Sequence, residues 1–191
     1  MDATIDQSPA RSDVRYTTTA QALHWVTAVL MFAVLPLAWV MVSMKDASPS
    51  RGLLFTLHKS VGLTILALAA ARLLWRAIYA PPPLRPFGRW EGRFVLASHW
   101  LLYFVMIAMP FSGYLLSAAK GRPVNYFGLF ALPALPKSEA LSHAADSAHV
   151  AVGQWLVYAL ILLHVLGTAW HVGVRRDGAL DRMLPQQNAR N

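Results

Sequence analysis

Histidine is the residue of this sequence with the widest chemical use. The 191 residues contain seven histidines and no cysteine. The histidines are His24, His58, His99, His143, His149, His164 and His171. An imidazole inside a membrane-spanning stretch is rare, and it commonly binds a metal or carries a proton. One such histidine could simply bond to a neighbouring helix, so only several at matching depths indicate a site.

The elements that carry these histidines are long and apolar. The sequence is 56% hydrophobic and 14% charged, whereas soluble domains have about 25% charged residues. No charged residue occurs over residues 16–44, 94–119 or 147–174, and about 20 apolar residues span a bilayer. A fourth stretch contains Lys59 and Arg72, whose long side chains can extend to the membrane surface. We therefore predict an all-α, four-helix transmembrane bundle with helices at about 20–43, 53–79, 94–118 and 147–174, and a tail at 175–191.

The basic residues predict how these helices cross the membrane. The net charge of +8 would favour nucleic-acid binding in a soluble protein, but here the basic residues lie between apolar stretches, so we expect lipid contact and no nucleic acid. Eleven arginines lie on the side of the two termini: Arg11, Arg15, Arg72, Arg76, Arg85, Arg89, Arg93, Arg175, Arg176, Arg182 and Arg190. Six basic residues lie on the other side: Lys45, Arg51, Lys59, Lys120, Arg122 and Lys137. The positive-inside rule therefore predicts that both termini are cytoplasmic.

Depth along the predicted helices sorts four histidines into two pairs. His24 lies near the cytoplasmic end of the first helix, and His58 lies near the outer end of the second. In the fourth helix, His149 lies near the outer end and His164 follows fifteen residues later, about 22 Å deeper and within about 60° of the same face. His58 and His149 therefore share an outer level, and His24 and His164 share an inner level.

Two histidines at one depth on different helices suit the axial positions of a haem iron. The porphyrin supplies four nitrogens, so two imidazoles complete six-coordination. Zinc and non-haem iron usually take three or four protein ligands, often carboxylates, and no acidic residue lies inside a predicted span. The absence of cysteine excludes covalent c-type haem and Cys-ligated iron–sulfur or zinc sites. The expected cofactors are two haem b groups between the helices.

Two glycines favour the outer site. Gly62 follows His58 by four residues, and Gly153 follows His149 by four, so each glycine shares a helix face with its histidine. The missing side chain would leave room for a flat macrocycle. Small residues also allow close helix packing in membranes, and that alternative stays open.

Arg72 and His171 are candidates for contacts to polar ligand groups. Arg72 follows His58 by fourteen residues, about 21 Å deeper on a face within about 40°, which is the level of His24 and His164. We expect it to bind a haem propionate, with a lipid phosphate as the alternative. His171 lies seven residues past His164 and could bond to a quinone carbonyl, or it could be structural.

The two remaining histidines are harder to place. His99 lies near the cytoplasmic end of the third helix and competes with His24 and His164 for the inner haem. His143 is expected in a loop just before the fourth helix. That connection, about residues 120–146, contains the stretch FGLFALPALP, which is expected to lie at the membrane interface or to form an irregular loop.

Several ordered motifs resemble the bacterial cytochrome b561 family. They are RYTTTAQALHW, LHKSVGL followed by ARLLWR, YAPPPLRP, SHWLLYFVMIAMPFSGYLLS, AHVAVGQWLVYALILLHVLG and RDGALDRMLP. The resemblance implies a four-helix, di-haem b cytochrome of the inner membrane. It implies that His24 pairs with His164 and His58 with His149, so that His99 is not a ligand. It also implies electron transfer from the periplasmic face to ubiquinone, with superoxide as the best-defined substrate of this group.

Two other functions compete with a superoxide:ubiquinone oxidoreductase. One is an electron-transfer subunit between a partner dehydrogenase or hydrogenase and the quinone pool, docked on the long third connection. The other is a small transporter or a structural membrane protein that uses histidines for helix packing. The lack of acidic residues inside the spans and of broken-helix signals argues against an ion-coupled transporter. Six basic against three acidic residues on the outer side could steer an anion such as superoxide, or they are ordinary loop composition. No residue is assigned as catalytic.

Overall fold

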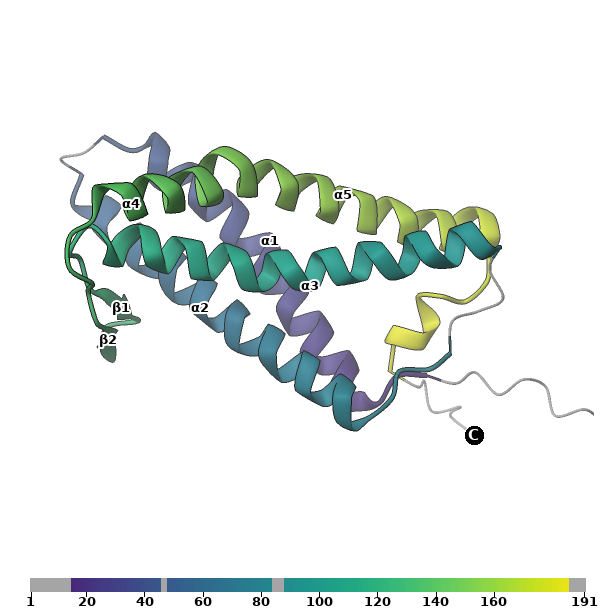
Figure 1. Cartoon of the computed structure of the whole chain (residues 1–191). Helices are drawn as coiled ribbons and strands as arrows, with labels where there is room; N and C mark the ends of the chain where they lie inside the picture. Colours follow the sequence, from purple (N-terminus) through teal and green to yellow (C-terminus); the bar gives the residue numbers. More distant parts are fainter. Residues whose placement is uncertain (1–14, 46–47, 84–87, 186–191) are drawn as a thin grey trace, which may run out of the picture.

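Four long helices dominate the computed structural model, which describes residues 15–45, 48–83 and 88–185. The first three are α1 (Thr18–Ser43), α2 (Pro49–Ile78) and α3 (Arg89–Ala118) (Figure 1). The fourth is a composite of α4 (Glu139–Asp146), the π-helical η1 (Ser147–Gly153), α5 (Gln154–Trp170) and the π-helical η2 (His171–Arg175). All four are long and apolar enough to cross a membrane, which confirms the predicted all-α, four-helix membrane fold.

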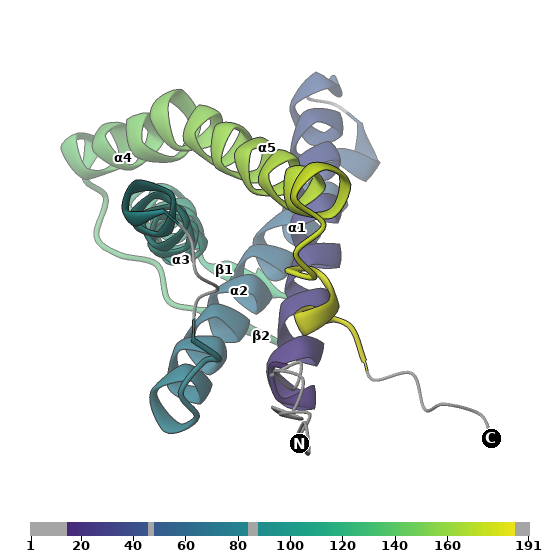
Figure 2. The same ribbon diagram turned by 90° about the vertical axis from the view of Figure 1, so that its right-hand side faces the viewer.

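The helices have a small core and a large apolar exterior. α2 contacts α1 and α3, and α3 in turn contacts α5, as the view along the bundle shows (Figure 2). Two clusters of buried residues join them: Val34, Ile65, Ala69 and Met106, and then Val105, Val157 and Leu160. Large side chains such as Trp39, Phe104 and Leu162 are exposed instead. This is the pattern expected of helices in lipid, where hydrocarbon surrounds the bundle and apolar residues need not be buried.

The fourth helix begins earlier than the apolar pattern predicts. α4 starts at Glu139, so His143 lies in a helix, and its predicted place in a loop is wrong. Ser138 caps α4 by accepting a hydrogen bond from the Leu141 N–H, and Glu139 places negative charge at the positive end of the helix. A pattern of apolar residues could not reveal α4, because this helix has only eight residues and half of them are polar or charged.

The connection between α3 and α4 contains a β-hairpin that the sequence did not predict. β1 (Val124–Tyr126) pairs antiparallel with β2 (Phe130–Leu132). Part of the stretch expected to be an irregular loop or an interfacial segment is therefore a strand. At the tip, Phe127 has φ 48° and Gly128 has φ 76°, and this left-handed backbone favours glycine.

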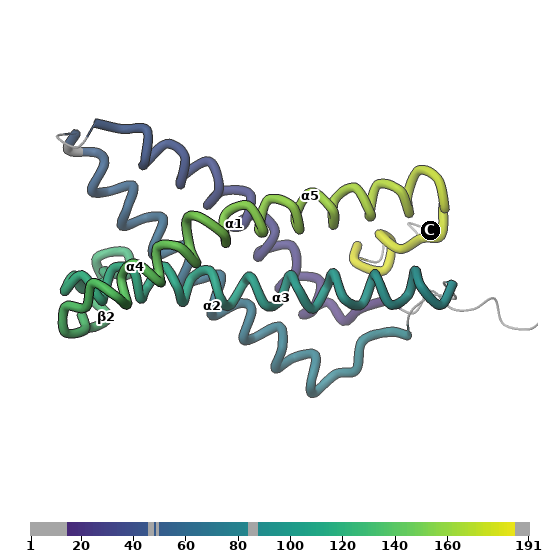
Figure 3. The backbone as a smooth tube through the Cα atoms, turned by 45° about the horizontal axis from the view of Figure 1, so that its top comes forward, coloured from purple at the N-terminus to yellow at the C-terminus, as the bar shows by residue number. Residues whose placement is uncertain are grey.

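The two ends of the described chain meet at the end of the bundle opposite to this hairpin. The Tyr16 N–H donates to the Arg182 carbonyl at 3.1 Å, and the Trp25 indole donates to the Met183 carbonyl at 2.8 Å. The tail after η2 thus turns back toward the start of α1 (Figure 3). We call this the terminal end of the bundle, and the other the hairpin end. Three arginines counted for the predicted orientation lie outside the described residues: Arg11, Arg85 and Arg190. Asp46, one of the three acidic residues of the outer side, also lies outside them.

Ser60 of α2 anchors the hairpin, and its replacement tests this contact. The buried Ser60 hydroxyl accepts the Phe127 N–H at 2.8 Å and donates to the Thr56 carbonyl at 2.7 Å. Ser60→Ala leaves the Phe127 N–H without this partner, which should cost about 1–3 kcal/mol. We expect a lower thermal unfolding midpoint and faster proteolysis of the hairpin in detergent. Thr56→Ala, which removes only a bond to the Gly52 carbonyl within α2, is the control; equal behaviour of the two variants would contradict the anchor.

Candidate functional site

Two histidines face each other across a cavity near the hairpin end. His58 of α2 and His149 of η1 have ring centres 6.2 Å apart, with their planes at 88°. Both line a cavity of about 580 Å³, together with residues of α1, α3 and α5, and sites for cofactors typically have roughly 300–1,000 Å³. A ligating nitrogen lies about 2 Å from its metal and about 1 Å from its ring centre, so two rings flanking one iron have centres about 6 Å apart. The pair therefore has the spacing that bis-imidazole ligation requires.

The protonation of His149 leaves one ring nitrogen available to a metal. Its Nδ1 lies 2.9 Å from the Met109 carbonyl oxygen, which can only accept, so Nδ1 carries the proton and Nε2 keeps its lone pair. Such a carbonyl is the usual outer partner of a metal-bound histidine. His58 Nδ1 is buried and has no hydrogen bond of good geometry to any described residue. The Val34 carbonyl is the acceptor beside it. A buried polar atom of this kind commonly has a functional explanation.

The π-helical turn η1 widens the fourth helix at His149. The Gln154 N–H donates to the His149 carbonyl, five residues earlier. Such turns insert an extra residue into a helix and recur at functional sites. Here the turn carries His149, which contacts the Met109 carbonyl, and Gly153, which lies against the Met109 side chain.

The two glycines named from the sequence have different neighbours. Gly62 lines the cavity, and a β-carbon there would meet only Pro110, at an ordinary 3.9 Å. Gly153 does not line the cavity, and a β-carbon there would overlap the Met109 sulfur and the Ala148 carbonyl oxygen. Gly62 is thus placed to leave space in the cavity, whereas Gly153 permits close packing of η1 on α3.

Gly113 of α3 belongs to the same site, and the sequence did not reveal it. It lines the cavity, and a β-carbon there would lie 2.9 Å from Cε1 of His149. It follows Met109 by four residues, so the carbonyl that orients His149 and the glycine that admits the ring share one face of α3. In the sequence, Gly113 is visible only as a glycine within the third predicted helix. Its role depends on which helix packs against it, and the sequence does not show this.

A second histidine pair lies toward the terminal end. His24 of α1 and His164 of α5 have ring centres 6.3 Å apart, at an interplanar angle of 57°. The Arg72 guanidinium lies 3.3 Å from His24 Nδ1 and over the Tyr103 ring, with its Cζ 5.2 Å from the ring centre. The structure therefore brings Arg72 to this pair, in contact with the histidine itself.

His99 of α3 reaches the same level. Its ring centre is 5.4 Å from that of His164, less than the about 6 Å of two rings that flank one iron, so distance favours His24. Protonation favours His99: its Nδ1 donates to the Val95 carbonyl at 2.6 Å, which leaves Nε2 with a lone pair. His24 Nδ1 instead accepts from Arg72, which can only donate, so the His24 proton lies on Nε2. Iron binding through His24 Nε2 requires that Nδ1 be released from Arg72.

The other two histidines lie elsewhere in the structure. His171 Nδ1 lies 2.7 Å from one Asp177 carboxylate oxygen, and the other oxygen accepts the Ala179 N–H. This contact bridges the turn from η2 into the tail, and the quinone contact predicted for His171 stays a prediction. His143 lies in α4 and does not line the 580 Å³ cavity.

One family model and several known proteins are similar to nearly the whole chain. The model described as prokaryotic cytochrome b561 matches residues 15–186. Cytochrome b561 homolog 2 of Escherichia coli (strain K12) is 31% identical over 177 residues, which cover 92% of this chain and 94% of that protein. The probable superoxide oxidase CybB of Yersinia pestis is 26% identical, with 91% and 97% covered. Cytochrome b561 homolog 1 of Escherichia coli (strain K12) is 24% identical, with 91% and 98% covered.

Matched glycine substitutions separate cofactor space from helix packing. Gly153→Ala should destabilise the protein by about 1–3 kcal/mol with or without haem, because the Met109 side chain or the helix backbone must move. Gly62→Ala should leave the apoprotein stable and reduce haem retention, because its methyl group enters the cavity. Gly173→Ala is the control, since nothing lies within 4 Å of the added carbon. Thermal unfolding and haem content measure the two effects; equal haem retention in Gly62→Ala and Gly173→Ala would refute the cavity role.

Proposed function

This chain belongs to the prokaryotic cytochrome b561 family, and from that premise we propose that it is a di-haem oxidoreductase that passes electrons from one membrane face to ubiquinone. The family makes it a bacterial membrane protein of electron transfer and implies that it binds haem b. Beyond this, we propose the number of haems, their ligands, the donor and the acceptor. One observation carries it: two histidine pairs, 6.2 and 6.3 Å across, lie at two levels of one bundle.

We assign His58 and His149 to one iron, and His24 and His164 to the other. Haem bound at these positions supplies one-electron redox chemistry. The chain holds the imidazoles and surrounds them with apolar helices, and burial of this kind tunes a haem potential. The choice of His24 over His99 rests on the ring distance and on the family motif. Arg72 places a positive charge beside His24, where it suits a haem propionate.

The residues around the hairpin-end cavity suit an anionic electron donor. Among the described residues that line it, four are basic and only Asp146 is acidic. The basic residues are Arg51, Lys59, Lys120 and Arg122. Positive potential in a low-dielectric cleft concentrates anions and speeds their association. Superoxide is such an anion, and the Yersinia pestis relative is named a probable superoxide oxidase. We propose that two superoxide ions are oxidised to dioxygen here, and that their two electrons reduce one ubiquinone with uptake of two protons.

The proposed orientation places the hairpin end at the periplasmic face of the inner membrane and both termini in the cytoplasm. Seven arginines of the helices and tail lie toward the terminal end: Arg72, Arg76, Arg89, Arg93, Arg175, Arg176 and Arg182. The positive-inside rule assigns such an end to the cytoplasm. The donor and the acceptor would then react at opposite faces.

Single alanine substitutions test the four ligands. His58→Ala and His149→Ala should each lose the haem of the hairpin end, and His24→Ala and His164→Ala should each lose the other, because one of the two imidazoles that would hold the iron is missing. Haem content per protein and the low-temperature absorbance spectrum report which haem is gone. His99→Ala is the control and should keep both. Loss of a haem in His99→Ala but not in His24→Ala would move the ligand to His99, and wild-type spectra in all four variants would overturn the assignment.

Rapid mixing of the oxidised holoprotein with superoxide tests the donor. We expect fast haem reduction, followed by reoxidation when ubiquinone-1 is present. The double substitution Lys59→Gln, Arg122→Gln should slow the reduction by about tenfold and weaken its dependence on ionic strength. Lys137→Gln, outside the cavity lining, should not. Haem reduction by a co-purifying dehydrogenase or hydrogenase, and none by superoxide, would establish the electron-transfer subunit instead.

A further inference from the structure

The β-hairpin ends in a tip that is apolar and exposed. Residues 123–136 contain no charged side chain. At the tip, which we define as residues 127–130, Leu129 is 78% exposed, Phe130 is 58% exposed and Phe127 is 44% exposed. A cluster of large apolar side chains on an exposed turn commonly marks a surface of interaction. We propose that the hairpin tip is a membrane anchor, whose three apolar side chains enter the interfacial region of the bilayer beside α2.

The contacts of the hairpin with α2 place it at the membrane. The Ser60 hydroxyl accepts the Phe127 N–H at 2.8 Å, and the hydroxyls of Thr64 and Tyr126 lie 3.1 Å apart. Ser60 and Thr64 follow Pro49, the first residue of α2, by eleven and fifteen residues, which is about 16 and 22 Å along the helix axis. The 30 residues of α2 measure about 45 Å, so an upright α2 would extend only about 7 Å beyond each side of a hydrocarbon core of about 30 Å. The hairpin therefore lies beside the membrane-spanning part of α2 and not beyond its end (Figure 1).

The backbone of the hairpin limits how deep the tip can lie. The Leu129 N–H donates to the Tyr126 carbonyl at 2.8 Å and closes the turn. Within the described sheet of two strands, β2 keeps one edge unpaired. Unpaired backbone groups are costly in hydrocarbon but can bond to water among the lipid headgroups. The backbone therefore belongs at the interface, and only the side chains reach the hydrocarbon. The rings of Tyr126 and Phe130, which stack with centres 5.0 Å apart, suit this region, where aromatic residues are enriched.

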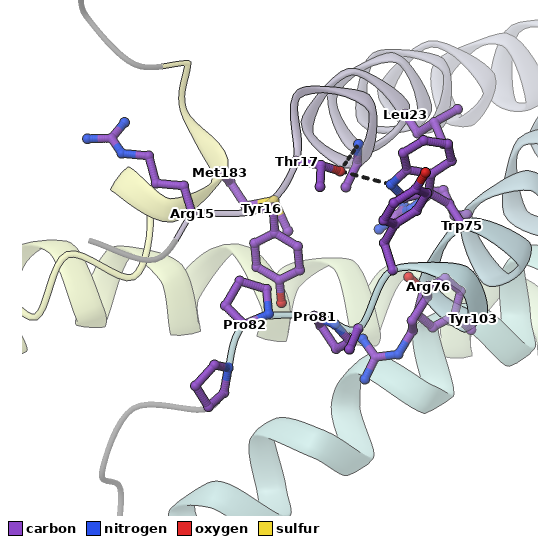
Figure 4. A pocket seen from close by; sticks show the side chains of 15 residues that line it. Arg15, Tyr16, Thr17, Leu23, Trp75, Arg76, Pro81, Pro82, Tyr103 and Met183 are labelled. Atoms are coloured by element: carbon purple, nitrogen blue, oxygen red, sulfur yellow. Dashed lines mark hydrogen bonds between the residues drawn. The ribbon is translucent and has the colours of Figure 1, made fainter. Parts of the chain in front are cut away.

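Aromatic residues at the terminal end of the bundle have different neighbours. Trp75 and Tyr79 line a cavity of about 260 Å³ together with arginines such as Arg76. The Trp75 indole donates to the Thr17 hydroxyl at 2.8 Å (Figure 4). Those rings thus lie among cations and polar partners, whereas the hairpin tip presents only apolar side chains. Hydrocarbon is the partner that the chemistry of the tip fits.

A lipid surface fits the hairpin better than a protein partner does. A soluble partner docked on this membrane face would meet the ends of the helices first, whereas the tip lies beside α2. Basic residues also flank the uncharged segment, with Lys120 and Arg122 before it and Lys137 after it. All three are exposed. Long basic side chains next to an apolar segment can reach lipid phosphates while the segment contacts hydrocarbon.

An anchored tip would also hold one wall of the hairpin-end cavity. Arg122 and Val124 line the 580 Å³ cavity, and Val124 is fully buried. They come directly before the tip in the chain, so a tip fixed in the interface keeps this wall at a constant depth. The inference does not depend on which group occupies the cavity.

Single fluorescent labels test the anchor, because the chain has no cysteine of its own. Leu129→Cys and Phe130→Cys each place one bimane label on the tip of the full-length protein in phosphatidylcholine vesicles. We expect both labels to lose most of their fluorescence when the lipid chains are brominated, because bromine quenches by contact, and to lose little with iodide in the water. Ala140→Cys is the matched control. It is exposed in the first turn of α4, in the same connection, and should be quenched by iodide instead.

Two results would overturn the anchor. Quenching of the tip labels by iodide and not by brominated lipid would leave the tip in water or on a protein partner. Equal quenching by brominated lipid at all three positions would mean that the tip has no special contact with the bilayer.

A double substitution tests the same contact without a label. Leu129→Ser with Phe130→Ser should keep the helix content and the haem spectrum, because both side chains are exposed. In vesicles, chymotrypsin should then cut after Tyr126 or Phe127 faster than in the wild type, because the tip no longer enters the bilayer. Wild-type resistance to chymotrypsin in this variant would contradict the anchor.

Discussion

Imidazole held in a hydrocarbon environment is the constraint on which the rest of this bundle depends. A polar group there is costly unless it finds a partner, and two pairs of histidines face each other from different helices at 6.2 and 6.3 Å. The helices must stay far enough apart to admit a group between the rings. The small clusters around Val34 and Val157 hold them there without filling that space. The packing of the helices therefore also determines whether a cofactor fits between the histidine rings.

The histidines of the two levels are held by different kinds of contact. At the hairpin end, a backbone carbonyl of α3 orients His149, and Gly113 lets the ring approach that helix. At the terminal end, a cation contacts His24, and His99 provides a third imidazole within 5.4 Å of His164. At the hairpin end, the proton of His149 lies on Nδ1, so its Nε2 is free to bind a metal. At the second level, the proposed binding of iron by His24 Nε2 requires that Arg72 release Nδ1. We therefore propose that the two levels differ in their affinity for haem.

The terminal end is built from segments that are distant in the chain. The tail is bound by the start of α1, and through Met183 it completes a cavity whose other walls come from α1, α2 and α3. The His171–Asp177 contact lies where the chain turns into this tail. This contact joins η2 to the tail, and the quinone contact predicted for His171 stays a prediction.

The sequence by itself determined the four spans and the depth of each histidine, because apolar length and helical rise are local properties. It also indicated that Arg72 would lie level with His24, since fourteen residues of one helix cover a definite distance. Only the tertiary structure decided what each residue touches: Gly153 meets Met109 and not the cavity, and a hairpin rests on Ser60. These contacts join helices and loops far apart in the chain, and no periodicity within one helix encodes which neighbour it will meet.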